Sequence, residues 1–212
     1  MSELKLEESI VQTMGQKLEG TGTNLAEIAV DSVLENGFLK DIPIVGSAIA
    51  IFKTGIAVKE RQYVKKLIRF LSELNKTNEE ARLRFIAEEM LEAEQRERFG
   101  ETVLSLIEKA DDSRKFELYA KVFERLFMNQ CNYDETIRIC LMIERSFYGD
   151  LKYIVDFSNG CPNDQLTAGE LYKVGFLSFG GIDGGVAGEE DSGGVIYTKN
   201  KYGEILIEII SH

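Results

Sequence analysis

The side chains of this sequence that could do chemistry are few and scattered. Its one histidine is His212, the last residue, whereas Ser-His-Asp, Cys-His and most His-metal mechanisms need a histidine beside other reactive groups. Carboxylate pairs such as Glu88 and Glu92 fall on the charged side of a predicted helix, where solvated charge is the usual outcome. The sequence therefore predicts no catalytic residue, and we expect the protein not to be an enzyme.

Neither the cysteines nor the glycine-rich segment forms a binding motif. Cys131, Cys140 and Cys161 are odd in number and have no CxxC spacing, which favours reduced thiols in a cytoplasmic protein. The glycine-rich, acidic segment 180–194 lacks both the GxxxxGK[ST] lysine of a phosphate cradle and the DxDxDG spacing of a calcium loop. We expect no cofactor and no metal site.

One apolar stretch, residues 42–58, is the strongest signal in the chain. Gly46, Ala50 and Thr54 are spaced four apart, so on a helix they form a smooth face of small side chains that lets another helix approach closely. The opposite side carries bulky residues, among them Phe52. A helix that is apolar nearly all round is expected to be enclosed on both sides.

Three interpretations of this stretch stay open. It is shorter than the ~20 residues that span a bilayer, and Lys53 near its middle would be costly there. These features favour a central core helix. The alternatives are a surface for self-association or a partner, and insertion into a membrane.

A basic run follows the apolar stretch directly. It consists of Lys59, Arg61, Lys65, Lys66 and Arg69 in a chain whose formal net charge is -11. The run could attract anionic lipid or an acidic partner, or it could be the solvated face of a helix. The overall negative charge argues against general nucleic-acid binding, which requires Lys and Arg to neutralise phosphates.

Helical periodicity and capping patterns dominate the first two thirds of the chain. They predict helices over residues 3–19, 24–34, 41 to beyond 71, 78–98, 101–109, 113–130 and 132–147. We expect these helices to form one helical domain, residues 1–148, as a bundle around the central apolar helix.

The sequence pattern changes at Gly149. Helices near 150–157 and 164–175 precede a strand-like FLSF, the glycine-rich segment, a strand-like VIYT and a last helix, which is the element order of a winged helix. The helix that would read DNA offers Lys173 as its only base. We therefore expect a mainly α protein whose residues 149–212 form a small winged-helix-like α+β domain for protein contact or structure.

The layout resembles the bacterial and phage accessory proteins labelled abortive infection alpha. The matching segments are IPIVGSAIAIFKTGIAVKERQYVKKLIRFL, KFELYAKVFERLF, IERSFYGDLKYI, VGFLSF and YTKNKYGEIL. They span most of the chain from Asp41 onward, and they include no catalytic residue. The resemblance implies a prokaryotic setting in antiviral defence.

Three functions follow as hypotheses. The leading one is a non-enzymatic cytoplasmic protein that acts through contact with a protein partner or through self-association, in phage defence. The first alternative is a membrane-active effector that perturbs the inner membrane through residues 42–58, with the basic run extending the contact to residue 69. The second alternative is a winged-helix transcriptional regulator.

Overall fold

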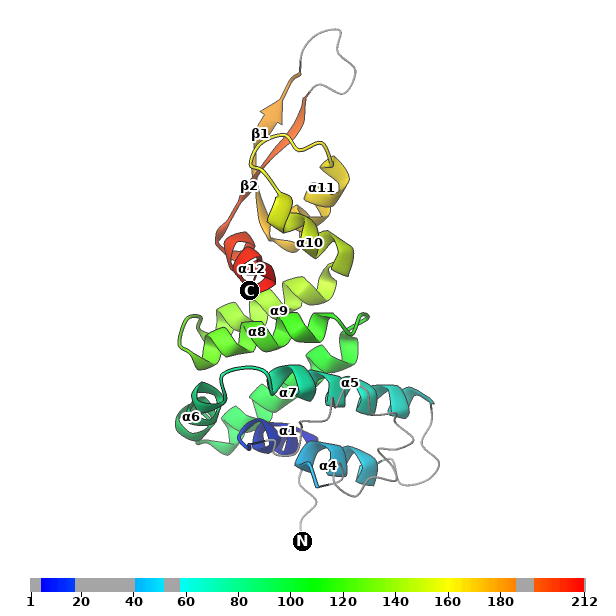
Figure 1. Ribbon diagram of the computed structural model, residues 1–212, viewed down its shortest axis with the longest axis vertical. Helices are drawn as coiled ribbons and strands as arrows, with labels where there is room; N and C mark the ends of the chain where they lie inside the picture. The colour runs from blue at the N-terminus through cyan, green and yellow to red at the C-terminus, as the bar shows by residue number, and fades with distance from the viewer. Residues whose placement is uncertain (1–4, 18–40, 52–57, 186–192, 212) are drawn as a thin grey trace. The chain divides into compact units, whose positions relative to one another are not determined.

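The protein is mainly helical, with a small two-stranded antiparallel sheet near its C-terminus (Figure 1), as the sequence predicts. The computed structural model describes residues 5–17, 41–51, 58–185 and 193–211. Its contacts divide the chain into two compact units, Met1–Tyr133 and Asp134–His212. The sequence-based domain boundary, between residues 148 and 149, falls later, so one predicted helix of the first domain groups mostly with the second unit.

The regular elements in the described part of the first unit are all helices. They are α1 (Leu6–Met14), α4 (Pro43–Ile51), α5 (Val58–Leu74), α6 (Glu79–Glu89), α7 (Ala93–Lys109) and α8 (Lys115–Phe127). The predicted helix over residues 24–34 lies outside the described residues. Six phenylalanines from α5, α6, α7 and α8 form the aromatic core, with neighbouring ring centroids 5.3–6.5 Å apart: Phe70, Phe85, Phe99, Phe116, Phe123 and Phe127.

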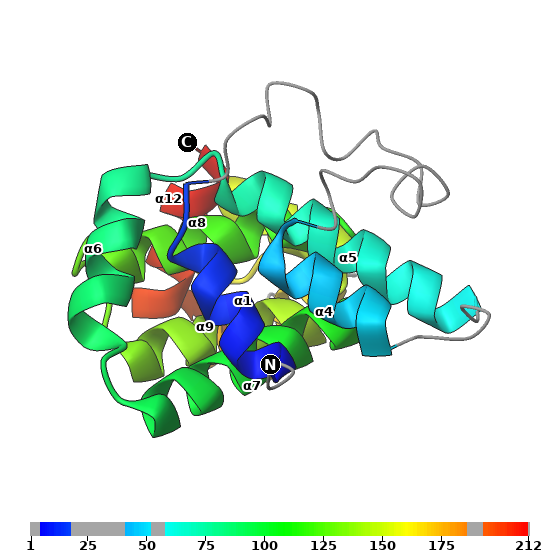
Figure 2. The same cartoon turned by 90° about the horizontal axis from the view of Figure 1, so that it is seen from below.

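The apolar stretch does not continue into one long helix, so this prediction is wrong. Helices α4 and α5 contact one another and lie side by side (Figure 2), which one unbroken helix cannot do. Helix α4 also packs on α1. Helical periodicity runs through both segments, but burying the apolar side of α4 requires it to pack against its neighbours.

The charged region after residue 78 also divides differently from the prediction. Helix α6 ends at Glu89, and α7 begins at Ala93 after a capping box between Glu92 and Gln95. The Arg96 guanidinium donates hydrogen bonds to two carbonyls of the turn between the helices. This local chemistry ends one helix and starts the next, whereas periodicity alone predicts continuous helix to residue 98.

Gly100, at the predicted break before residue 101, lies inside α7 and is buried against α1. A Cβ atom at this position would lie 2.2 Å from the Glu7 carbonyl oxygen. The glycine therefore serves a close approach of two helix backbones rather than a helix end. Arg82 of α6 secures the other end of α1, because its buried guanidinium donates to the carbonyls of Met14 (2.8 Å) and Gln16 (3.2 Å).

The second unit has the element order of a winged helix, as predicted. Its elements are α9 (Tyr133–Arg145), α10 (Tyr148–Asp156), α11 (Gln165–Val174), β1 (Leu177–Asp183), β2 (Gly194–Lys199) and α12 (Lys201–Ser211). Asp164 caps α11 by accepting from the Thr167 N–H, and Gly175 ends it in the left-handed conformation, with φ of 104°. Helices α10 and α12 contact one another, and their buried residues include Leu151, Ile154 and Leu206.

Candidate functional site

The predicted small-residue face is only partly described by the structure. Gly46 and Ala50 lie in α4, and both are half-buried, while Phe52 and Thr54 lie outside the described residues. The buried side of α4 is formed instead by Ile44, Val45 and Ala48. In the described part of the apolar stretch, the fully buried residues thus lie on one side of α4, and its other residues are half-buried except Ile51, which is exposed.

Two polar contacts hold α4 against α1. The Ile44 N–H donates to the Thr13 hydroxyl at 3.1 Å, so a side chain of α1 satisfies a backbone donor at the start of α4. The hydroxyls of Ser9 and Ser47 share a hydrogen bond of 2.8 Å. We call these two contacts the α1–α4 seam.

The basic run is carried by α5, and its residues have different environments. Lys59, Arg61 and Lys65 are exposed, whereas Lys66 and Arg69 are half-buried. Lys66 donates to the Glu108 carbonyl at 2.6 Å, which joins α5 to the C-terminal end of α7. The structure therefore separates the exposed cations from Lys66, whose ammonium makes a structural contact.

Large apolar side chains lie on either side of residues 52–57. Ile51 at the end of α4 is 56% exposed, and Val58 at the start of α5 is 72% exposed. Val58 is followed at once by Lys59, so apolar and cationic side chains are adjacent at the start of α5. We refer to Ile51, Val58, Lys59, Arg61 and Lys65 as the α5 surface.

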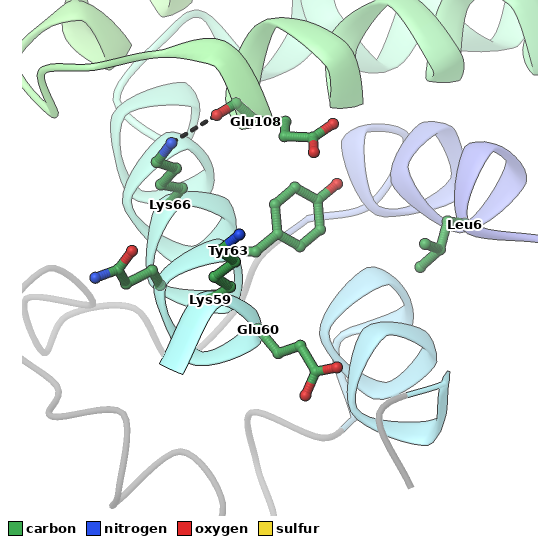
Figure 3. A pocket seen from close by; sticks show the side chains of 7 residues that line it. Leu6, Lys59, Glu60, Tyr63, Lys66 and Glu108 are labelled. Carbon is green, nitrogen blue, oxygen red and sulfur yellow. Dashed lines mark hydrogen bonds between the residues drawn. The ribbon is translucent and has the colours of Figure 1, made fainter. Parts of the chain in front are cut away.

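A pocket of about 510 Å³ lies beside the α5 surface (Figure 3). It is lined from α1, α5 and α7 by Leu6, Lys59, Glu60, Gln62, Tyr63, Lys66 and Glu108. The two lysines and the two glutamates balance in formal charge. The pocket therefore has no excess charge to attract a strongly ionic ligand.

Tyr63 is a half-buried polar residue of this pocket. Its ring points from α5 towards Glu108 and α1 (Figure 3). Burial is the main cause that raises the pKa of Tyr63 to about 12, and the negative charges of Glu108 and Glu7 contribute to the same rise. The phenol thus stays protonated at neutral pH and can donate a hydrogen bond, but it cannot serve as a base there.

Only some residues of this pocket were recognisable from the sequence. It identified Lys59 and Lys66 as members of the basic run. Tyr63 matched the apolar spacing of a helix and therefore looked like a core residue. Glu108 and Leu6 come from distant helices, and only the packing of α1 and α7 around α5 brings them here.

The described residues do not hold the groups that metal binding or membrane crossing would require. No three His, Cys, Asp or Glu side chains among them converge on a possible metal position. Within the same ranges, no helix is both long and apolar enough to cross a bilayer.

The winged-helix-like unit offers a different surface from the α5 surface. Lys173, the single base of α11, is paired with Glu170 at 2.6 Å. Leu166 and Tyr172 of the same helix are exposed. The surface of α11 is therefore partly apolar, and its base is already paired with a carboxylate.

The chain was compared with protein-family models, curated proteins and solved structures. None of these comparisons gave a match.

Proposed function

We propose that the protein is non-enzymatic and acts by binding a protein partner through the α5 surface. The observation that carries this proposal is the pairing of exposed Ile51 and Val58 with the exposed cations Lys59, Arg61 and Lys65. Apolar side chains rimmed by charge are typical of protein contact sites. The partner's surface is acidic, because three exposed cations on an otherwise acidic chain select for negative charge.

The neighbouring pocket supports contact rather than catalysis. Its phenol is protonated at neutral pH, and Lys66 is engaged with a backbone carbonyl. Neither group is an activated nucleophile or base. In this proposal the pocket receives a partner side chain and performs no reaction.

Site-specific photo-cross-linking in cells of the organism that encodes the chain tests the contact. p-Benzoylphenylalanine replaces Arg61 in one variant and Glu88, which is exposed on α6, in a control variant. We expect a protein adduct of defined mass from position 61 and none from position 88. Adding Lys59→Glu and Lys65→Glu should lower the adduct yield about tenfold, because the charge of the surface is reversed.

The outcome that contradicts the proposal is equally specific. An absence of protein adducts at position 61, or the same adducts at positions 61 and 88, would show that the α5 surface makes no selective contact. Turnover of a substrate by the purified protein would contradict the non-enzymatic part.

Phage defence is the biological setting of the proposal. Its support is the resemblance of the apolar, charged and winged-helix-like segments to abortive infection alpha proteins. Expression in a bacterial host challenged with a panel of phages should lower plating efficiency about tenfold or more for at least one phage. The Lys59→Glu/Lys65→Glu variant should lose this protection. Unchanged plating for every phage in the panel would argue against this setting.

A second candidate function is membrane perturbation by α4. The α1–α4 seam favours it, because two polar contacts hold an apolar helix whose last residue is already exposed. Thr13→Val removes the acceptor for the Ile44 N–H and should increase leakage of anionic vesicles, whereas Gly46→Leu should abolish it. Vesicles that stay intact with both the natural protein and Thr13→Val would eliminate this candidate.

A further inference from the structure

The two edges of the β1–β2 hairpin differ in how their backbone groups are satisfied. The outer edge of β2 is covered by the chain before and within α11. Gln165 donates to the Val195 carbonyl (3.3 Å) and accepts from its N–H (3.2 Å), so one side chain imitates a paired strand. Gly160 and Tyr197 exchange two backbone hydrogen bonds of 3.0 and 2.9 Å. The Lys199 N–H donates to the side-chain oxygen of Asn159.

Among the residues that the structure describes, none covers the outer edge of β1 in this way. Groups of an antiparallel strand point alternately towards and away from the partner strand. Val195, Tyr197 and Lys199 bond outwards from β2, so the β1 residues opposite them, Ile182, Phe179 and Leu177, also direct their backbone groups outwards. Within the described parts of the chain, no backbone or side-chain group pairs with this edge.

A β-bulge places two large apolar residues on the same face beside this edge. Phe179 and Ile182 are three residues apart, which would put them on opposite faces of a regular strand. The register shift between Phe179 and Gly181 restores them to one face, opposite Tyr197 and Val195. Phe179 is 55% exposed and Ile182 is 74% exposed.

Such an edge is unusual for an isolated protein. Natural sheets protect their edges with Lys, Pro, bulges or covering segments. Strand β1, with the sequence LSFGGID, has the bulge but no Lys or Pro, while the neighbouring β2 edge is covered along its length. The hairpin also extends beyond α11 (Figure 1).

The charge around the hairpin indicates what could bind there. Residues 134–212 contain thirteen Asp and Glu against six Lys and Arg. Three of those bases already have carboxylate partners, since Lys173 pairs with Glu170, Lys199 with Glu204 and Lys201 with Glu135. A second copy of this acidic unit would be repelled, whereas a basic segment would be attracted.

We propose that the open edge of β1 binds an extended, basic segment of a partner protein, which adds a third strand beside Phe179 and Ile182. The inference rests on the proposed function in one respect, that the protein acts through protein contact, and it uses a surface distinct from the α5 surface. Backbone pairing supplies the affinity, and apolar residues at alternate positions contact the exposed face. Lys or Arg in the segment complements the acidic unit.

Two substitutions at Ile182 isolate the backbone contribution. Ile182→Pro removes both the side chain and the outward N–H, while Ile182→Thr removes the apolar side chain but keeps the N–H and a β-branched shape. Proline is tolerated at edge positions whose N–H faces solvent. Circular dichroism and thermal unfolding of both variants verify that the unit stays folded.

The probe is a phage-displayed library of random peptides of about ten residues, panned against the full purified chain. We expect enriched peptides with alternating apolar residues and Lys or Arg. The corresponding synthetic peptides should bind Ile182→Pro about tenfold more weakly than the natural chain, with Ile182→Thr between them. Equal binding by the natural chain and Ile182→Pro, or enrichment without bases, would overturn the proposal.

A further experiment distinguishes binding of a partner segment from pairing of the β1 edge with a second copy of the chain. Sedimentation velocity of the natural chain and Ile182→Pro shows whether the β1 edge pairs with another copy; dimerisation that only the proline variant loses would overturn the basic-segment proposal. These measurements use peptides and purified protein. Failure of the cross-linking at position 61 therefore leaves their result intact, and their failure leaves the α5 surface untouched.

Discussion

The start of α5 and the β1–β2 hairpin both expose large apolar side chains, but they do so in opposite electrostatic surroundings. At the α5 surface, exposed Val58 directly precedes the cation Lys59 at the start of a helix, and exposed Ile51 ends the helix before it. At the hairpin, Phe179 and Ile182 lie beside a backbone edge that no described residue pairs with, in an acidic unit. The two proposed contacts therefore depend on different chemistry, side-chain charge at the α5 surface and backbone pairing at the hairpin.

The comparison requires that each surface depend on the packing of its own unit, and two glycines test this with the largest expected effect. A Cβ on Gly203 would lie 2.4 Å from the Phe176 carbonyl oxygen, within the second unit. Gly203→Ala should lower the free energy of unfolding of that unit by about 1–3 kcal/mol, because the backbones must separate. Gly100→Ala should do the same in the first unit.

Hydrogen exchange resolved by segment measures both variants. Faster exchange should be confined to residues 134–212 for Gly203→Ala and to the first unit for Gly100→Ala. Gly184→Ala is the matched control, because a Cβ there meets no atom within 4 Å and should change little. Uniform acceleration in both units would show that the two surfaces are not independent.

A substitution at Gln165 tests whether the β2 edge depends on the side chain that covers it. Gln165→Leu removes the side chain that pairs with both backbone groups of Val195. We expect a loss of about 1–2 kcal/mol in the stability of the second unit, from the net value of these hydrogen bonds. Chemical denaturation measures it, with Leu166→Ala as the control because Leu166 is 75% exposed. Unchanged stability would mean that Gln165 does not protect the edge.

Binding at the two surfaces should differ in its dependence on salt. Raising NaCl from about 50 to about 500 mM shortens the Debye length to a few ångströms and screens exposed charges. The adduct yield at position 61 should fall several-fold more than the affinity of an edge-binding peptide, because backbone pairing is less sensitive to screening. Titration of both contacts in salt checks this, and equal salt dependence would contradict the assignment of different chemistry.

The smallest predicted effect concerns the pocket beside the α5 surface. Because burial raises the pKa of Tyr63 to about 12, the folded state holds its proton more tightly than the unfolded state does. This contribution to stability is present in full below pH 10 and is lost as pH rises from 10 to 12. Ultraviolet titration should show a phenol that titrates near pH 12 and is lost in Tyr63→Phe. If the titration curves of the natural chain and Tyr63→Phe differ by a transition near pH 10, the buried position of Tyr63 would be contradicted.

The element types were largely predictable from the sequence, because helical periodicity and turn residues are local signals. The winged-helix order of the second unit followed from the residues around Gly175 and the two strand-like runs. The division of the apolar stretch into α4 and α5, and the role of Gly100, were not predictable in this way. Both depend on contacts between helices distant in sequence.

The candidate sites were predictable only in part for the same reason. The closely spaced bases of α5 are visible directly in the sequence, but which of them are exposed is not. The open edge of β1 was not identifiable, because it depends on which of two strands is covered by Gln165 and Gly160 and on a bulge that shifts the face of Ile182. Alternation alone places Phe179 and Ile182 on opposite sides.

The most direct test of the account places p-benzoylphenylalanine at positions 61 and 182 in parallel and identifies the adducts by mass spectrometry. The account predicts protein adducts at both positions, with an acidic contact segment at 61 and a basic, extended segment at 182. Adducts with lipid alone at position 61, or the absence of any protein adduct at either position, would contradict the claim that the protein acts through protein contacts.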